Sequence, residues 1–191
     1  MREGWCVWVT GLPGSGKSTV SRYLLKILKK KNVHAQILSS DMLRKVMTPN
    51  PKYTVEERDI VYGTLVFIAA LLVKNGVNVI IDATGNFRRY RENARKRIKK
   101  FVEVYLNCPL EVCMKREAER KVRFHAPKGV YRKAFNGESS TVPGLGAPYE
   151  EPLNPELSID SSEMSPERCA AAIFDKLCEL KYLSSEVCKY I

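Results

Sequence analysis

Short apolar runs alternate with amphipathic stretches along most of the chain. Residues 5–10 form an apolar run with high β propensity, which predicts a buried strand. Residues 20–31 carry apolar side chains at helical spacing and predict a helix. The same reasoning predicts further strands at residues 35–39, 77–82, 101–107 and 157–160. It predicts further helices at residues 42–47, 54–74, 89–100, 109–120, 131–135 and 165–180.

Alternating strands and helices are typical of an α/β fold with a parallel sheet covered on both faces. We therefore expect a five-stranded parallel sheet in a single domain over residues 1–191. Ligands of such sheets bind at the carboxyl ends of the strands. Thr10, Asp41, Asp82 and Asn107 all fall near these ends, which predicts a site there.

A glycine-rich segment joins the first strand to the first helix. Its sequence from Gly11 to Ser18, GLPGSGKS, matches the P-loop pattern G-x-x-x-x-G-K-[ST]. The order of strand, loop and helix is the one the motif requires, and it predicts a three-layer P-loop NTPase fold that binds ATP and Mg²⁺. The candidate nucleotide-binding residues are Gly11, Leu12, Pro13, Gly14, Ser15, Gly16, Lys17, Ser18 and Thr19.

Three polar residues near these strand ends are candidates for chemistry on the nucleotide. Lys17 supplies a positive charge for the β- and γ-phosphates, and the Ser18 hydroxyl is a candidate Mg²⁺ ligand. Asp82 ends an apolar strand, from which a carboxylate can hold Mg²⁺ through water. Asp82 is equally well placed to cap the helix that follows it, and one residue can do both.

Asp41 follows the second strand and is a candidate base or orienting group for an acceptor hydroxyl. The alternative is that Asp41 caps the helix expected over residues 42–47. Arg44 lies one turn further along and is a candidate ligand for an anionic acceptor.

The net charge of +11 is concentrated in one window of the chain. Sixteen basic and five acidic residues lie within residues 88–133. This window is interpreted as solvated helix faces, as a basic lid over nucleotide phosphates, or as an RNA-binding surface. Residues 117–156 are too long for a plain connection and predict a lid or substrate loop. Arg116, Arg120 and Arg123 can present guanidinium groups into that lid, with Arg116 the preferred catalytic candidate.

The six cysteines show no C-x-x-C spacing. We expect reduced, mostly buried thiols in a cytoplasmic protein, with no zinc site, no signal peptide and no membrane partner.

Two segments near the end of the lid resemble a known family. Residues 128–134, KGVYRKA, resemble the K-G-[LV]-Y-x-K-A motif of adenylylsulfate (APS) kinases. Residues 144–157 resemble that family's G-x-x-x-P-Y-E-x-P…N-P-E-L. With the P-loop and Asp41, the resemblance extends over most of the chain. It implies a kinase that transfers the γ-phosphoryl group of ATP to the 3′-hydroxyl of APS. It also implies that Lys128 and Arg58, the arginine of the family's R-x-x-N, bind substrate.

The chain departs from this family on the acceptor side. Val61 stands where the family has the Asn of R-x-x-N, and Val142 stands where it has a stacking Phe. An insertion occupies the region of residues 117–125. Residues 82–84, DAT, followed by Arg88, Arg89 and Arg91, resemble polynucleotide-kinase-like and seryl-tRNA-kinase-like P-loop kinases instead.

Three functions therefore remain open. The first is an APS kinase, and the second is a P-loop kinase for another small metabolite or an RNA-linked hydroxyl. The third is a nucleotide-binding switch without an acceptor. The sequence also leaves open whether the chain forms a homodimer.

Overall fold

A five-stranded parallel sheet forms the centre of the computed structural model, which describes residues 3–122 and 124–189. The spatial order of the strands is β2-β3-β1-β4-β5. The strands are β1 (Cys6–Thr10), β2 (Ala35–Ser39), β3 (Asn78–Asp82), β4 (Phe101–Asn107) and β5 (Leu157–Asp160). All five expected strands are confirmed. The three central strands are largely buried, whereas the edge strands β2 and β5 are only partly buried.

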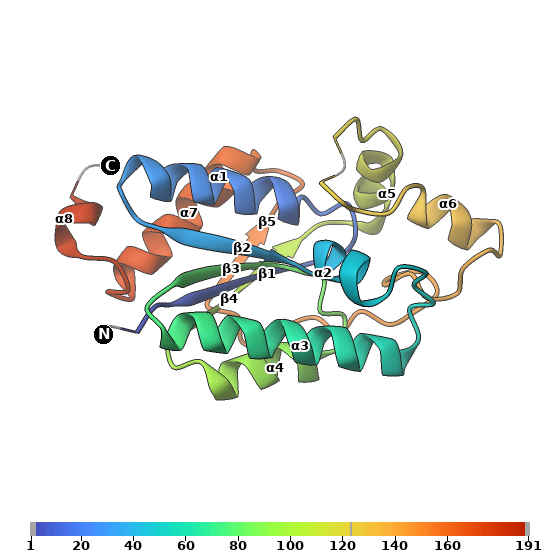
Figure 1. Cartoon of the computed structure of the whole chain (residues 1–191). Coiled ribbons are helices and arrows are strands. Elements are labelled where there is room, and N and C mark those ends of the chain that lie inside the picture. The colour runs from blue at the N-terminus through green and yellow to red at the C-terminus, as the bar shows by residue number, and fades with distance from the viewer. Residues whose placement is uncertain (1–2, 123, 190–191) are drawn as a thin grey trace.

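Helices cover both faces of the sheet, which confirms the three-layer α/β fold (Figure 1). One face carries α1 (Lys17–Lys30) and α7 (Pro166–Glu179), and the other carries α3 (Val55–Lys74) and α4 (Arg88–Arg97). Each helical layer packs an apolar cluster against the sheet. Leu24 and Ile173 belong to the first cluster, and Leu65 belongs to the second.

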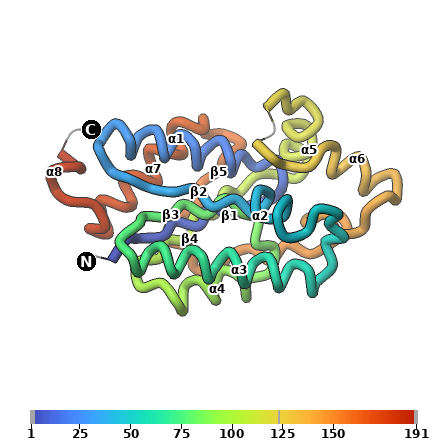
Figure 2. The backbone as a smooth tube through the Cα atoms, viewed as in Figure 1, coloured from blue at the N-terminus to red at the C-terminus, as the bar shows by residue number. Residues whose placement is uncertain are grey.

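Three short helices gather at the carboxyl ends of the strands, at the end of the molecule opposite the N-terminus (Figure 2). They are α2 (Ser40–Met47), α5 (Leu110–Ala118) and α6 (Val130–Phe135). A further helix, α8 (Ser185–Cys188), was not expected from the sequence because it has only four residues.

Both capping roles considered for the acidic residues are wrong. Helix α2 begins at Ser40 and is capped by the Ser39 hydroxyl, so Asp41 lies inside its first turn. Helix α4 begins only at Arg88, after Phe87 as N-cap, which leaves Asp82 well outside it. Both carboxylates are therefore available for other chemistry.

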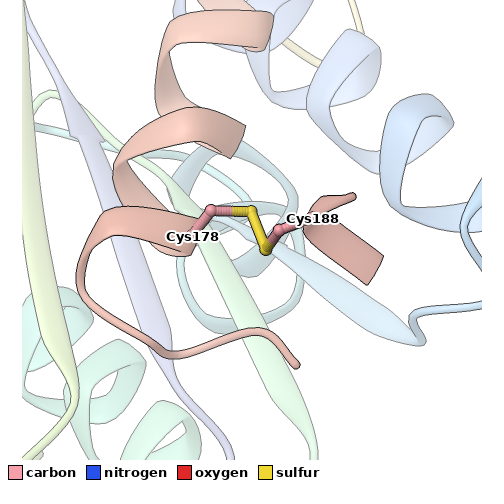
Figure 3. Close-up of a disulfide and its surroundings, with 2 residues drawn as sticks. All are labelled: Cys178 and Cys188. Carbon is pink, nitrogen blue, oxygen red and sulfur yellow. A yellow bond between two sulfur atoms is a disulfide. The ribbon is translucent and has the colours of Figure 1, made fainter. Parts of the chain in front are cut away.

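The cysteine prediction is wrong at one pair. Cys178 at the end of α7 and Cys188 in α8 form a disulfide, whereas Cys6, Cys108, Cys113 and Cys169 are free and buried (Figure 3). The C-x-x-C test could not detect this pair, because the two cysteines are ten residues apart and meet only through the turn between the two helices.

Replacing Cys188 with serine is expected to lower the free energy of unfolding by about 2–3 kcal/mol, because the disulfide closes a short loop in the unfolded chain. Chemical denaturation of both proteins with and without dithiothreitol measures this. The reductant should destabilise the wild type and leave the variant unchanged. Equal stability of the oxidised wild type and the variant would contradict the prediction.

Among residues 3–122 and 124–189, no helix is both long enough and apolar enough to cross a membrane.

Candidate active site

A cavity of about 430 Å³ lies at the carboxyl ends of β1, β2 and β3. The P-loop forms its floor, α2 and the start of α3 form one wall, and residues 82–84 and 139–143 form another. The connection between α5 and α6, within the basic window, lines the remaining side. The cavity thus brings together segments that are far apart in the chain.

The P-loop backbone depends on glycine at two positions. Gly14 has φ +88°, and a Cβ there would lie 2.2 Å from the backbone oxygen of Cys113 in α5. Gly16 has φ +97° and is the N-cap of α1, with no side chain capping that helix end. The first N–H groups of α1 therefore remain for an anion, as the dipole of the helix favours.

Lys17 lies inside the loop it belongs to. Its Nζ donates hydrogen bonds to the carbonyl oxygens of Gly11 at 3.0 Å and Leu12 at 2.8 Å. Burial lowers the pKa of Lys17, while the negative charges of Asp82 and Asp41 act in the opposite direction. The cation is therefore held at the mouth of the loop, close to both carboxylates.

Asp82 and Asp41 form an acidic pair beside this lysine. Burial raises the pKa of Asp82, and a hydrogen bond from the Ser18 side chain opposes that shift. Burial also raises the pKa of Asp41, reinforced by the charge of Asp82 and opposed by Lys17 and Arg44. The predicted Mg²⁺ ligands Ser18 and Asp82 are therefore in contact.

Arg44 is buried in the cavity wall with unused hydrogen-bonding capacity. The residue is 5% exposed, and its Nη1 and Nη2 atoms find no hydrogen-bond partner in the described part of the chain. Its guanidinium lies 4.7 Å from the ring centroid of Tyr53, and Nη1 is 3.8 Å from the Glu57 carboxylate. Buried Nη groups without hydrogen bonds are costly, and a bound anion would satisfy them.

Arg58 also lines the cavity, but its guanidinium already binds protein. Nε donates to the carbonyl of Tyr53 at 3.1 Å, Nη1 to Asn86 Oδ1 at 3.1 Å, and Nη2 to the carbonyl of Thr141 at 2.6 Å. The structure thus makes Arg58 a brace between three segments, in addition to the substrate contact expected from the sequence.

Asn86 extends this brace to the PYE segment. Its Nδ2 donates to the carbonyl of Pro148 at 3.1 Å, and its own carbonyl accepts from the Glu150 amide at 2.8 Å. The Tyr149 hydroxyl lies 3.0 Å from Thr10 Oγ1 at the end of β1. The segment that carried the family resemblance therefore fastens the lid loop to the sheet.

The arginines of the lid region differ in their surroundings. Arg116 of α5 lines the cavity, and it is held there by a hydrogen bond to the carbonyl of Ser161 at 2.9 Å and a contact of 3.7 Å with Cys108 Sγ. Arg120 also lines the cavity, and its charge acts on Lys17, Asp41 and Asp82. Arg123 lies outside the described residues.

The KGVY segment and the insertion before it cover the cavity. Lys128 is part of the lining, and the Tyr131 hydroxyl donates to the P-loop carbonyl of Pro13 at 2.8 Å. In the insertion, the Phe124 ring lies 3.8 Å from the Arg22 guanidinium carbon, and His125 Nδ1 lies 3.1 Å from Lys45 Nζ. These contacts join the lid to α1 and α2.

Sequence reasoning missed Tyr53, Phe124 and Asn86. Tyr53 lines the cavity and directly precedes Thr54, the capping residue of α3, and this position was the one available signal for it. Phe124 and Asn86 contact residues about 100 and 60 positions away, which no local pattern reveals.

Several arginines of the basic helix α4 are paired with carboxylates of the same chain and are not available to a ligand. Arg91 is buried and pairs with Glu103 of β4 at 2.6 Å. Arg95 contacts both Glu103 and Glu156, and Arg89 pairs with Asp59 of α3. Because these arginines already pair with carboxylates of the same chain, the charge left for an RNA surface is smaller than the sequence implied.

The fold and the cavity define a P-loop kinase, with a phosphate-binding loop facing a basic wall and two carboxylates. The family model for adenylylsulphate kinase matches residues 3–160. The chain belongs to this family and is an ATP-dependent phosphotransferase.

Individual relatives agree with this assignment over nearly their whole length. A probable adenylyl-sulfate kinase of Pyrococcus abyssi is 40% identical over 181 residues, covering 95% of this chain and 99% of the relative. The adenylyl-sulfate kinase of Rippkaea orientalis is 36% identical and covers 97% and 98%. The Mycobacterium tuberculosis APS kinase CysC, solved in complex with AMPPNP and APS, superposes with a TM-score of 0.82. It is 31% identical and covers 93% of this chain and 99% of its own.

Proposed function

We propose that this chain transfers the γ-phosphoryl group of ATP to the 3′-hydroxyl of adenylyl sulfate, which yields 3′-phosphoadenylyl sulfate. The main evidence for an acceptor-binding site is the buried Arg44 guanidinium, whose two Nη atoms have no hydrogen-bond partner in the described residues. The family membership and the relative solved with AMPPNP and APS support the same reaction.

The donor half rests on the P-loop. Residues 11–19 hold the triphosphate. When the nucleotide binds, Lys17 Nζ exchanges its hydrogen bonds with two loop carbonyls for hydrogen bonds with phosphate oxygens. Ser18 and Asp82 would hold Mg²⁺, which neutralises charge on the β- and γ-phosphates. The residues present fit that ion, because Mg²⁺ bound to a nucleotide needs only one or two protein ligands beside phosphates and water. No cluster of three His, Cys, Asp or Glu side chains suited to a metal occurs among the described residues.

The acceptor half lies between α2 and α3. Arg44 binds the negatively charged phosphosulfate portion, and Lys128 adds positive charge from the lid. Tyr53 offers an aromatic ring to the acceptor base in a site where Val142 replaces the family's stacking Phe. Asp41, on the first turn of α2, orients the 3′-hydroxyl and accepts its proton.

Positive charge around the transferred group comes from the end of α5. Arg116 is held rigidly by Ser161 and Cys108, and Arg120 is close enough to the two carboxylates to affect their ionisation. Guanidinium groups in such positions stabilise the charge that develops on the phosphoryl oxygens. The requirement for ATP supports a cytoplasmic location for the reaction.

An acceptor-dependent ATPase assay tests the proposal. ADP release from wild-type protein should require adenylyl sulfate, and the phosphorylated product should be detected by mass spectrometry. Arg44→Ala should raise KM for adenylyl sulfate about 10- to 100-fold, since charged hydrogen bonds are lost, and leave KM for ATP nearly unchanged. Arg97→Ala, an exposed arginine of α4, is the matched control and should behave as wild type.

Two results would contradict the proposal. Turnover on another alcohol without turnover on adenylyl sulfate would assign the chain to a different hydroxyl acceptor. ATP binding without stimulation by any acceptor would indicate a nucleotide switch. The relatives described above are adenylyl-sulfate kinases and lend no support to an RNA acceptor.

A further inference from the structure

The connection between α5 and α6 places an apolar surface against the charged part of the cavity. Figure 1 shows this connection beside the N-terminal end of α1, which carries Lys17 and Ser18. Its apolar side chains that line the cavity are Val122, Phe124, Ala126 and Pro127. These side chains have no group that forms hydrogen bonds, so binding of phosphate, metal or an acceptor hydroxyl does not explain their position.

Phe124 is the largest of these side chains, and a charged residue of α1 holds its ring. The Arg22 guanidinium carbon lies 3.8 Å from the ring centroid, which is an attractive cation–π contact. Arg22 follows Ser18 by one turn of α1, so the two residues share a face of the helix. Burial raises the pKa of Asp82, and the charge of Arg22 is among those that oppose this shift. The Phe124 ring is therefore anchored beside the proposed Mg²⁺ ligands Ser18 and Asp82.

The backbone turns at Phe124 so that two successive side chains contact two different helices. Phe124 and His125 have φ angles of +42° and +78°, a region that is unfavourable for residues with a Cβ. Phe124 contacts Arg22 of α1, whereas His125 Nδ1 lies 3.1 Å from Lys45 Nζ of α2. Such conformations persist where surrounding contacts hold them, and they cluster at functional sites. The turn thus joins the helix of the phosphate donor to the helix that carries the acceptor candidates.

Water competes with the acceptor for the same phosphoryl group. In the transfer, the acceptor oxygen bonds to the γ-phosphorus, the bond from that phosphorus to the β–γ bridging oxygen breaks, and the hydroxyl proton passes to Asp41. In hydrolysis a water oxygen forms the new bond instead, the same bond breaks, and ADP, inorganic phosphate and a proton are released. Water is smaller than any acceptor, so a kinase that spares ATP has to keep it away from the γ-phosphate.

We propose that Phe124, anchored by Arg22, excludes water from the γ-phosphoryl group and so determines that the group passes to the acceptor. A ring that only fastened the lid to α1 would leave the choice between acceptor and water unaffected. The inference rests on the proposed function for its transfer step. Its first test needs no acceptor, so its failure is distinguishable from a wrong choice of acceptor.

ATP hydrolysis in the absence of any acceptor is the first test. Phe124→Ala should raise the release of ADP and inorganic phosphate by about tenfold, because the shortened side chain admits water to the phosphate. Phe124→Tyr keeps a ring for Arg22 and should restore the low rate. Phe135→Ala is the matched control, since Phe135 lies in α6, is 62% exposed and does not line the cavity. An increased rate cannot result from unfolding, so the expected gain separates this role from a loss of structure.

The partition of ATP in the presence of adenylyl sulfate is the second test. Wild-type protein should form equal amounts of ADP and phosphorylated product, and Phe124→Ala should release ADP in excess. Arg22→Ala should shift the ratio in the same direction, and combining it with Phe124→Ala should add little, because the two residues form one contact.

Two results would overturn the proposal. One is hydrolysis without acceptor that Phe124→Ala leaves unchanged, and the other is a slower Phe124→Ala enzyme whose ADP and product remain equal. A wild type that does not use adenylyl sulfate, together with faster hydrolysis in Phe124→Ala, would refute the proposed acceptor and still support the exclusion of water by Phe124.

Discussion

Replacing Lys17 with alanine will abolish phosphoryl transfer while the fold survives. We expect kcat to fall by about 10³-fold or more, because the substitution removes a charge aimed at the transferred phosphoryl group from a low-dielectric cavity. The structure gives the reason that folding is spared. Lys17 contacts two carbonyls of its own loop, and burial already disfavours its charged form. Its loss should change the free energy of unfolding by no more than about 1 kcal/mol.

Acceptor-dependent ADP release and chemical denaturation of the same preparations measure these two quantities. Lys30→Ala is the matched control, because Lys30 ends the same helix and is exposed. Unchanged turnover in Lys17→Ala would refute the assignment of residues 11–19 as the phosphate-binding loop. An unfolded variant would show that the lysine is structural.

Replacing Asp41 with asparagine should lower kcat by about 10²- to 10⁴-fold and change ATP affinity little. The side chain keeps its size but loses its negative charge and its ability to accept a proton. The Asp41 carboxylate is well suited to that role, because burial and the neighbouring Asp82 raise its pKa. The prediction depends on Asp41 acting on the acceptor, with Asp82 acting on the metal.

Single-turnover kinetics and nucleotide binding, measured separately, distinguish the two roles. Asp175→Asn, in α7 and remote from the cavity, is a suitable control for the change of charge. A selective loss of nucleotide binding in Asp41→Asn, with the rate of the bound enzyme preserved, would show that Asp41 acts on the metal and not on the acceptor hydroxyl.

The strands and the P-loop could be predicted because their signals are local. The central strands are runs of buried apolar residues, and the two edge strands β2 and β5 still combine apolar residues with strong β propensity. The predicted bounds 35–39, 101–107 and 157–160 agree with the structure to the residue. Asp41 and Asp82 line the cavity, as predicted by the rule that ligands bind at the carboxyl ends of parallel strands. Arg44 and Arg116 also line it, and they were predicted from their positions on helices, one turn after Asp41 and at the start of the lid.

The remaining features depend on contacts between distant residues. The Cys178–Cys188 disulfide, the Arg91–Glu103 ion pair and the Arg22–Phe124 contact each join separate elements. A sequence pattern indicates the secondary structure that a segment prefers, but it carries little information on which distant segment the residues will contact. The predictions that Asp41 and Asp82 cap helices were wrong for a related reason. The N-cap residues of α2 and α4 are Ser39 and Phe87, so these helices begin elsewhere than the sequence pattern indicated.

The bonds of Arg58 and Asn86 also constrain how this enzyme could change its acceptor during evolution. Through them, the loop before α3, the turn after β3, the lid loop and the PYE segment share one hydrogen-bonded junction. A substitution that reshapes one of these segments leaves buried donors or acceptors unsatisfied in the others. New acceptors therefore require coordinated changes in four segments of the chain, and exchange of a single pocket residue with another kinase would not be enough.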